Sequence, residues 1–112
     1  MIGRFIVSRL SGIRVYPQVL PQDVTLPAVT YNQISRSALH AFGGDRSTRN
    51  RVQIDVWAEG YSEVRSLAAE VKERLSRYRG ENVRDVFLTN EFEGFEDGTR
   101  RVTQEYIIYE EE

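Results

Sequence analysis

The chain has 112 residues, with 15 basic and 17 acidic side chains and a net charge of -2. This length predicts a single domain over residues 1–112 with one modest core, and the balanced charge provides no bulk attraction to nucleic acid or to an anionic membrane. The absence of cysteine excludes disulfides, thiolate metal sites and cysteine nucleophiles. No apolar run has the length of a membrane span or the pattern of a signal peptide, so we expect the chain to fold in cytoplasm.

The first ten residues have apolar side chains at the spacing of a short helix. These side chains fall three, four and eight positions after Ile2, which places them on one helical face. Residues 11–12, Ser-Gly, can end this helix. Residues 15–21 contain two prolines, which disfavour helix, and therefore predict an extended connection.

Two strands are predicted in the first half of the chain. Residues 26–35 are rich in β-branched and aromatic side chains. Residues 51–57 alternate between apolar and polar side chains, with Val52, Ile54 and Val56 on the apolar face. This second segment therefore predicts a half-buried strand.

Residues 36–50, between these two strands, show no hydrophobic period and contain the pair Gly43-Gly44. A loop of this length inside a small domain is usually functional or disordered. We therefore predict a long loop that is mobile in the free monomer and becomes ordered against a partner. Its basic side chains suit pairing with acidic residues of a neighbouring subunit. They lack the interleaved aromatic residues that are typical of a single-strand nucleic-acid binder.

One longer amphipathic helix is predicted over residues 61–78. Its apolar face carries Val64, Leu67, Ala68, Val71, Leu75 and Tyr78. Glu63 in the first turn and Arg77 in the last turn complement the helix dipole. Gly80 is a suitable stop.

Two further strands are predicted over residues 83–92 and 99–109. The dipeptide Asp97-Gly98 between them is a strong hairpin signal. In the first strand, period two predicts one face with Val86, Leu88 and Phe92. In the second strand, it predicts two faces: Val102, Tyr106 and Ile108 against Thr103, Glu105, Ile107 and Tyr109.

The order of these elements predicts an α+β fold, with a short N-terminal helix followed by β-β-α-β-β. One amphipathic helix then covers one face of a four-stranded antiparallel or mixed sheet. The opposite face carries Trp57, Ile107 and Tyr109, which is more apolar surface than a solvated face needs. This face is a candidate protein interface.

The sequence predicts no catalytic, cofactor or metal site. His40 is the only histidine, and its surroundings of glycine and arginine are typical of a solvated side chain. The acidic cluster Glu91, Glu93, Glu96 and Asp97 lacks the alternating ligands of a calcium loop, so a solvated hairpin is favoured. The serines have no histidine at a recognisable spacing. We therefore expect a structural or interaction role and no enzyme.

Four segments, taken together, resemble the small tail-completion proteins, or tail terminators, of long-tailed bacteriophages and phage-like particles. They are residues 26–31 (LPAVTY), residues 51–57 (RVQIDVW), the helix through Val64, Leu67 and Val71, and the strand that ends in residues 106–109 (YIIY). The resemblance covers about residues 15–109. Members of this family often have a longer N-terminal helix than the one predicted here.

The resemblance implies a structural virion protein that forms a ring, usually a hexamer, on the head-proximal end of the tail tube. Such a ring stops tube polymerisation and joins the tail to the head connector, while DNA passes through the lumen without specific binding. The implied partners are copies of the chain itself, the tail tube protein and the head connector or stopper protein, with no cofactor and no membrane. The implied location is the virion tail, after assembly in the cytoplasm of the host bacterium.

Two alternatives stay open at this point: a head–tail connector or adaptor of the same kind of particle, and a small nucleic-acid-binding module. Salt-dependent retention of DNA would support the second alternative. For the assembly role, we expect interface contacts from Arg36, His40, Arg46, Arg49, Arg51, Trp57, Ile107 and Tyr109.

Overall fold

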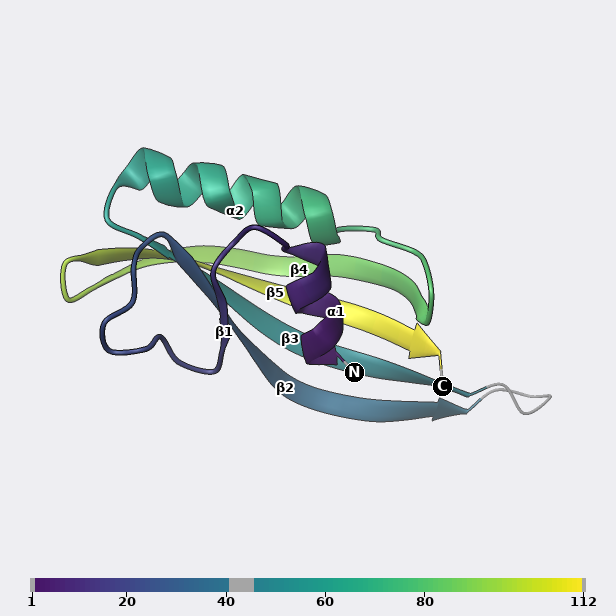
Figure 1. Cartoon of the computed structure of the whole chain (residues 1–112). Helices are drawn as coiled ribbons and strands as arrows, with labels where there is room; N and C mark the ends of the chain where they lie inside the picture. The colour runs from purple at the N-terminus through teal and green to yellow at the C-terminus, as the bar shows by residue number, and fades with distance from the viewer. Residues whose placement is uncertain (1, 41–45, 112) are drawn as a thin grey trace.

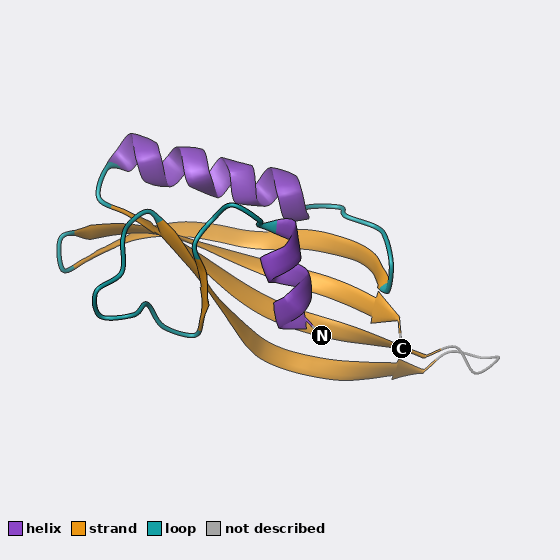
Figure 2. Ribbon diagram, in the orientation of Figure 1, coloured by secondary structure: helices purple, strands orange, loops and turns teal. Residues whose placement is uncertain are grey.

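The computed structural model describes residues 2–40 and 46–111 and has two helices on one side of a single sheet (Figures 1 and 2). The elements in chain order are α1 (Ile2–Arg9), β1 (Val15–Pro17), β2 (Ala28–His40), β3 (Arg46–Ala58), α2 (Tyr61–Leu75), β4 (Val83–Glu96) and β5 (Thr99–Glu111). The strands form a five-stranded sheet in the order β1-β2-β3-β5-β4. The predicted α+β class is confirmed, and the predicted strand count of four becomes five.

The additional strand is β1, which lies within the predicted extended connection. It pairs with β2 in parallel, with Val15 opposite Val29 and Pro17 opposite Tyr31. The pairing continues just outside β1, because the Gln18 amide donates to the Tyr31 carbonyl oxygen at 2.8 Å. A strand of three residues is too short to show a hydrophobic period, so only its contact with β2 identifies it.

The predicted loop over residues 36–50 is mostly strand. β2 continues to His40, β3 begins at Arg46, and these two residues are opposite one another in an antiparallel pairing that includes Arg36 opposite Asn50. The long-loop prediction is therefore wrong for residues 36–40 and 46–50. Residues 41–45, which include the glycine pair, lie outside the described residues.

The strand period is absent from this part of the sequence because its buried positions are polar. Thr48 and Asn50 are 2% and 0% exposed. Asn50 Nδ2 donates to the Ile108 carbonyl oxygen at 3.2 Å, and Gln33 Nε2 donates to Asn50 Oδ1 at 2.8 Å. Because these hydrogen bonds satisfy the buried amide, polar side chains can occupy positions that are apolar in an ordinary strand.

The longer helix, α2, ends at Leu75, three residues before the predicted end at Tyr78. Ser76 is its C-cap, and Arg77 has a φ of 60°. This left-handed residue ends the helical path and directs the chain towards β4, where the Arg77 amide donates to the Val86 carbonyl oxygen at 2.7 Å. The predicted apolar face packs on the sheet: Val64, Ala68, Val71 and Leu75 are buried, and Leu67 and Tyr78 are partly buried.

The predicted hairpin at Asp97-Gly98 is confirmed. Glu96 ends β4 and lies opposite Thr99, the first residue of β5. Asp97 and Gly98 have φ values of 51° and 76°. Positive φ at both central residues is the requirement of the tight turn whose twist matches that of the flanking strands.

The N-terminal helix α1 covers the end of the core beside α2 (Figure 1). Ile2, Ile6 and Leu10 are buried, as the predicted spacing requires. Arg9 Nε and Nη2 donate to the Arg74 carbonyl oxygen at 3.1 and 2.9 Å. Because Arg74 lies in the last turn of α2, this contact satisfies a carbonyl group that has no partner within that helix.

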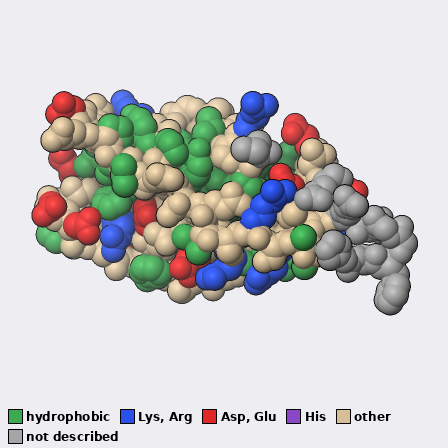
Figure 3. All heavy atoms as spheres, turned by 90° about the horizontal axis from the view of Figure 1, so that it is seen from below, with side chains coloured by type: hydrophobic (Ala, Val, Ile, Leu, Met, Phe, Trp, Pro, Cys, Tyr) green, Lys and Arg blue, Asp and Glu red, His purple; other side chains and the backbone are tan. Residues whose placement is uncertain are grey.

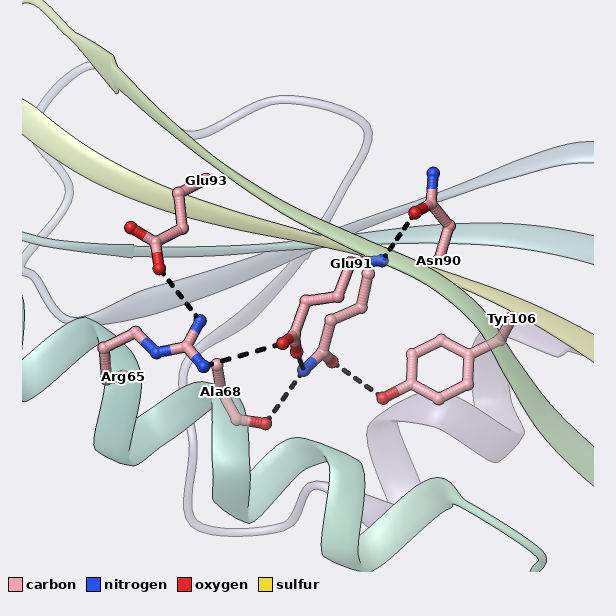
Figure 4. Close-up of polar contacts among 7 residues, drawn as sticks. Arg65, Ala68, Asn90, Glu91, Glu93 and Tyr106 are labelled. Atoms are coloured by element: carbon pink, nitrogen blue, oxygen red, sulfur yellow. Dashed lines mark hydrogen bonds and ion pairs between the residues drawn. The ribbon is translucent and has the colours of Figure 1, made fainter.

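A buried polar cluster joins α2 to the sheet (Figure 4). Gln104 Nε2 donates to the Ala68 carbonyl oxygen at 3.0 Å and to Glu91 Oε2 at 2.7 Å, while Tyr106 Oη donates to Gln104 Oε1 at 2.7 Å. Burial, and secondly the charge of Glu91, raises the pKa of the Tyr106 hydroxyl above its ordinary value. The Tyr106 hydroxyl therefore remains a donor throughout the neutral range.

Candidate assembly interface

The lower face of the sheet carries neither helix, and we call it the helix-free face. Side chains alternate between the two faces along each strand. The residues of β3 and β5 that alternate with the core residues therefore lie on the helix-free face. The register pairs Trp57 with Arg101, Arg51 with Ile107, and Arg49 with Tyr109. Figure 3 shows this underside, where hydrophobic, basic and acidic side chains are interspersed. The mixed character that the sequence predicts for this face is therefore present.

Five of the residues expected at the interface belong to this face: Arg49, Arg51, Trp57, Ile107 and Tyr109. Arg36 lies on the opposite face, because it pairs with Asn50 and lines a pocket with Ile2 and Gly3 of α1. His40 and Arg46 are opposite one another in register at the ends of β2 and β3, and the structure describes only their backbone. The structure thus separates residues that the sequence placed in one loop.

Ile107 is only 6% exposed, so its side chain contributes mainly to packing within the monomer. Its register neighbours are Arg51 on β3 and Phe87 on β4. Trp57 is half-buried, and its Nε1 donates to Thr30 Oγ1 at 3.0 Å. The apolar area available to a partner here is therefore smaller than the sequence predicts.

Arg101 is held across the helix-free face between Trp57 and Gly94. Its guanidinium carbon lies 5.7 Å from the centre of the Trp57 ring. A Cβ added to Gly94, which is opposite Arg101, would lie 2.5 Å from Arg101 Nη2. Glycine at this position therefore leaves the space that Arg101 occupies. Arg101 Nε is buried without a hydrogen-bond partner among the described residues.

A charged and aromatic row runs along the β4 margin of the same face. Arg77 lies over Phe87, 4.7 Å from the ring centre, and Phe87 meets Tyr109 edge-on with the ring centres 5.9 Å apart. Arg77 and Arg79 both bond to Asp85, with Nη2–Oδ2 distances of 2.9 and 3.1 Å. The hydrogen bond from Arg77 is the main reason that the pKa of Asp85 lies well below its ordinary value. Tyr109 is thus anchored through Phe87 to a fixed ion pair.

Phe92 is on the opposite face from the one that simple alternation predicts. It pairs with Thr103, on the helix-free face, whereas Val86 pairs with Ile108 in the core. The register shifts between Leu88 and Asn90, and this bulge reverses the direction of the following side chains. The only sequence signal for this change of face was that Phe92 is an apolar residue between acidic residues of the strand.

The acidic cluster predicted at the β4–β5 hairpin is partly engaged with α2. Arg65 Nη1 bonds to Glu93 Oε2 at 3.2 Å, and Arg65 Nη2 is 3.6 Å from Glu91 Oε1 (Figure 4). Within residues 2–40 and 46–111, no group of three or more histidine or acidic side chains gathers as a metal site. In the same part of the chain, no helix has the length and apolar character to span a membrane.

A broad mixed sheet face and long strand edges are features typical of small subunits that assemble with other proteins. The family model for tail completion protein gp17 matches residues 6–111, so the chain belongs to that family. It is therefore a structural protein of tail assembly and a component of a phage-type tail. The predicted resemblance is confirmed.

The comparison with solved structures supports the fold. The chain is similar to a chain of the virion of a native gene transfer agent particle, with 14% identity and a TM-score of 0.67. The match covers 96% of this chain and 84% of the other. At this identity the likeness shows the fold alone. No curated protein matches the chain.

Proposed function

We propose that this protein forms a ring, most simply a hexamer, on the head-proximal end of a tail tube. The ring stops tube polymerisation and joins the tail to the head connector, and DNA passes through its lumen without specific binding. Membership of the tail completion family is the observation that carries this proposal. Stopping tube growth and joining the tail to the head need no active site, and we propose that the protein works without catalysis.

The helix-free face supports the proposal, because it offers a broad surface from rigid strands. Trp57 and Tyr109 are half-buried aromatic residues of this face, and Arg49 and Arg51 are basic residues of it near the start of β3. Aromatic residues and arginine are the types that most often anchor protein interfaces. We propose that these four residues contact neighbouring subunits or the tube. We propose a second contact region at Arg36, His40 and Arg46, at the end of β2 and the start of β3.

The proposal is tested by adding the purified protein to growing tail tubes of the same particle. We expect tubes to stop elongating, with one ring at one end, and the mass of the bound species to be a small multiple of the 13.0 kDa chain. A protein that binds isolated head connectors and leaves tube length unchanged would instead be an adaptor. A protein that stays monomeric with both partners contradicts the assembly role.

A further inference from the structure

Among the described residues, the outer sides of β2 after Tyr31 and of β4 after Val86 are paired with no further strand. β1 covers β2 only from Val29 to Tyr31. Among the described residues, no backbone–backbone hydrogen bond reaches the outer side of β2 beyond Tyr31, and none reaches the outer side of β4 beyond Val86. Unpaired amide and carbonyl groups on long strands are a template for pairing with another chain.

These edges lack most of the devices that keep sheet edges apart. Residues 32–40 (NQISRSALH) and 87–96 (FLTNEFEGFE) contain no proline and no lysine. Each segment has one bulge, between Gln33 and Ser35 and between Leu88 and Asn90. Beyond these bulges, both strands continue in regular register with their inner neighbours. On the outer side of β4, the Glu91 amide donates to Asn90 Oδ1 at 3.0 Å, so this local side-chain contact must give way where a partner strand pairs.

Exposed hydrophobic side chains are concentrated on the same two segments. Seven large hydrophobic side chains are exposed among the described residues, and four of them are here. Ile34 and Leu39 on β2 are 48% and 38% exposed, and Phe92 and Phe95 on β4 are 44% and 65% exposed. A partner that pairs with either backbone edge would also cover these side chains.

The charges of the two segments are complementary. The β4 segment carries Glu91, Glu93 and Glu96 and no basic residue. The β2 segment carries Arg36 and no acidic residue, and Arg49 lies beside it on β3, opposite Ser37. Opposite charges favour contact between the two different edges over contact between two copies of the same edge.

The strand directions also match. β3 is antiparallel to β2, β5 is antiparallel to β3, and β4 is antiparallel to β5, so β2 and β4 run in opposite directions. A second copy in the same orientation therefore brings its β2 antiparallel to the first copy's β4, which is the commoner pairing. A contact between two different edges is heterologous, the kind that closes into a ring when the rotation is suitable.

We propose that the outer edge of β4 in one copy pairs with the outer edge of β2 in the next copy, so that one sheet continues around the ring. This inference rests on the proposed function and names the surfaces that build the ring. Within one copy, Glu93 is level with Val29, because Glu93 pairs with Val102, Val102 with Val56, and Val56 with Val29. Arg36, in contrast, lies in the middle of the β2 segment 32–40. Neighbouring copies are therefore displaced along the strands.

Such a displacement is normal when the strands of a closed sheet are inclined to its axis. Four strands about 4.8 Å apart and tilted by about 40° accumulate an offset of about 16 Å, or about five residues. The offset required here is seven positions along β2, from Val29 to Arg36, one of them the bulged residue. The two values are close enough for inclined strands to account for the pairing.

Single prolines can test the outward amides. In a hairpin with a two-residue turn, the pair beside the turn, Glu96 and Thr99, is hydrogen-bonded, so Glu93 and Phe95 direct their backbone groups outward. On β2, Gln33 lies opposite Val52 and Arg36 lies opposite Asn50. Val52 and Asn50 are two residues apart on β3 and direct their backbone groups to the same side, so Gln33 and Arg36 both direct theirs outward. Alternation along β2 gives the same outward direction for Ala38. Glu93→Pro and Ala38→Pro therefore remove an outward donor and leave the inner ladders intact.

We expect either proline variant to weaken ring formation on tail tubes about tenfold or more, measured as ring mass against protein concentration. Glu93→Ala is the matched control, because it loses the ion pair with Arg65 and keeps the amide; Ala38→Ser is the control for β2. Both controls should form rings much better than the corresponding proline variants, because Glu93→Ala removes the charge of one side chain and keeps the backbone donor. Proline variants that form rings as well as their controls overturn the edge pairing and leave the proposed function standing. A wild-type chain that forms no ring contradicts the proposed function, and the edge pairing with it.

Cross-linking provides a second test that does not depend on proline. The chain contains no cysteine, so Glu93→Cys and Ala38→Cys each introduce a single thiol. A short bis-maleimide added to assembled rings should join the two variants when they are mixed and should join neither variant to itself. Efficient cross-linking of Glu93→Cys alone would indicate β4-to-β4 pairing, and no cross-link in rings of the mixture would place the contact elsewhere; both results overturn the proposal.

Discussion

Arg77 holds both carboxylate oxygens of Asp85, with Nε–Oδ1 and Nη2–Oδ2 distances of 2.9 Å each. The pair joins the residues that follow α2 to the edge strand β4. Arg79 adds a third bond at 3.1 Å, and the Val86 amide donates to Asp85 Oδ1 at 2.9 Å. The carboxylate is therefore the fixed point at which the helix layer is joined to the sheet margin.

Asp85→Asn should lower the Tm at neutral pH. The folded pKa of Asp85 is depressed, so its contribution to stability is present above the unfolded pKa of about 4 and is lost as the pH falls towards the folded pKa. The Tm difference between wild type and variant should be constant from pH 5 to pH 8 and shrink below about pH 4. Asp23→Asn, at an exposed position, is the control for the change of charge. An equal effect of the two substitutions would contradict the role of the ion pair.

Tyr106→Phe should destabilise the fold by about 1–2 kcal/mol, because it leaves the buried Gln104 oxygen without its donor. Urea unfolding at pH 7 measures this free energy. Tyr16→Phe, outside the buried cluster, should change the stability by less than about 0.5 kcal/mol. Similar values for the two substitutions would show that the cluster in Figure 4 adds little to the packing of α2 on the sheet.

Gly94→Ala should displace Arg101 while preserving the fold, because the added methyl group meets the mobile end of a long side chain. Trp57 is the only tryptophan, so its fluorescence reports the loss of the guanidinium group from its ring. We expect a shifted emission spectrum and a nearly unchanged Tm. Gly60→Ala, where no atom lies within 4 Å of the added carbon, should leave the emission unchanged.

Trp57→Ala should reduce ring formation more than it reduces folding, since the indole is half-buried on the helix-free face. Ring mass on tail tubes and Tm are measured on the same preparation. Tyr61→Ala is the comparison, because it removes an aromatic side chain, 52% exposed, from α2. If Trp57→Ala lowers folding and assembly to the same extent, Trp57 acts through core packing.

Amide exchange should alternate along residues 37–39 in the free monomer. Ser37 and Leu39 direct their amides to β3 and should exchange slowly, whereas Ala38 directs its amide outward and should exchange fast. A mobile loop would exchange quickly at all three positions. In the ring, the Ala38 amide should become protected, which measures the edge pairing directly.

The sequence by itself determined the elements whose pattern is local. The period of 3.6 in α2, the alternation of Val52, Ile54 and Val56, and the Asp97-Gly98 turn each need only neighbouring residues to be recognised. The family resemblance also depended on these segments. Of the candidate interface, alternation correctly placed Trp57, Ile107 and Tyr109 on one face.

Only the tertiary structure decided the features that depend on a distant partner. The bulge before Asn90 turns Phe92 to the helix-free face, residues 36–40 pair with residues 46–50 as strands where the sequence predicts a loop, and the three residues of β1 form a strand beside β2. In each case the backbone hydrogen bonds are made with residues far away in the chain. Local side-chain pattern contains no information about those bonds, so the edges and the exact faces of the sheet emerge only when the strands are paired.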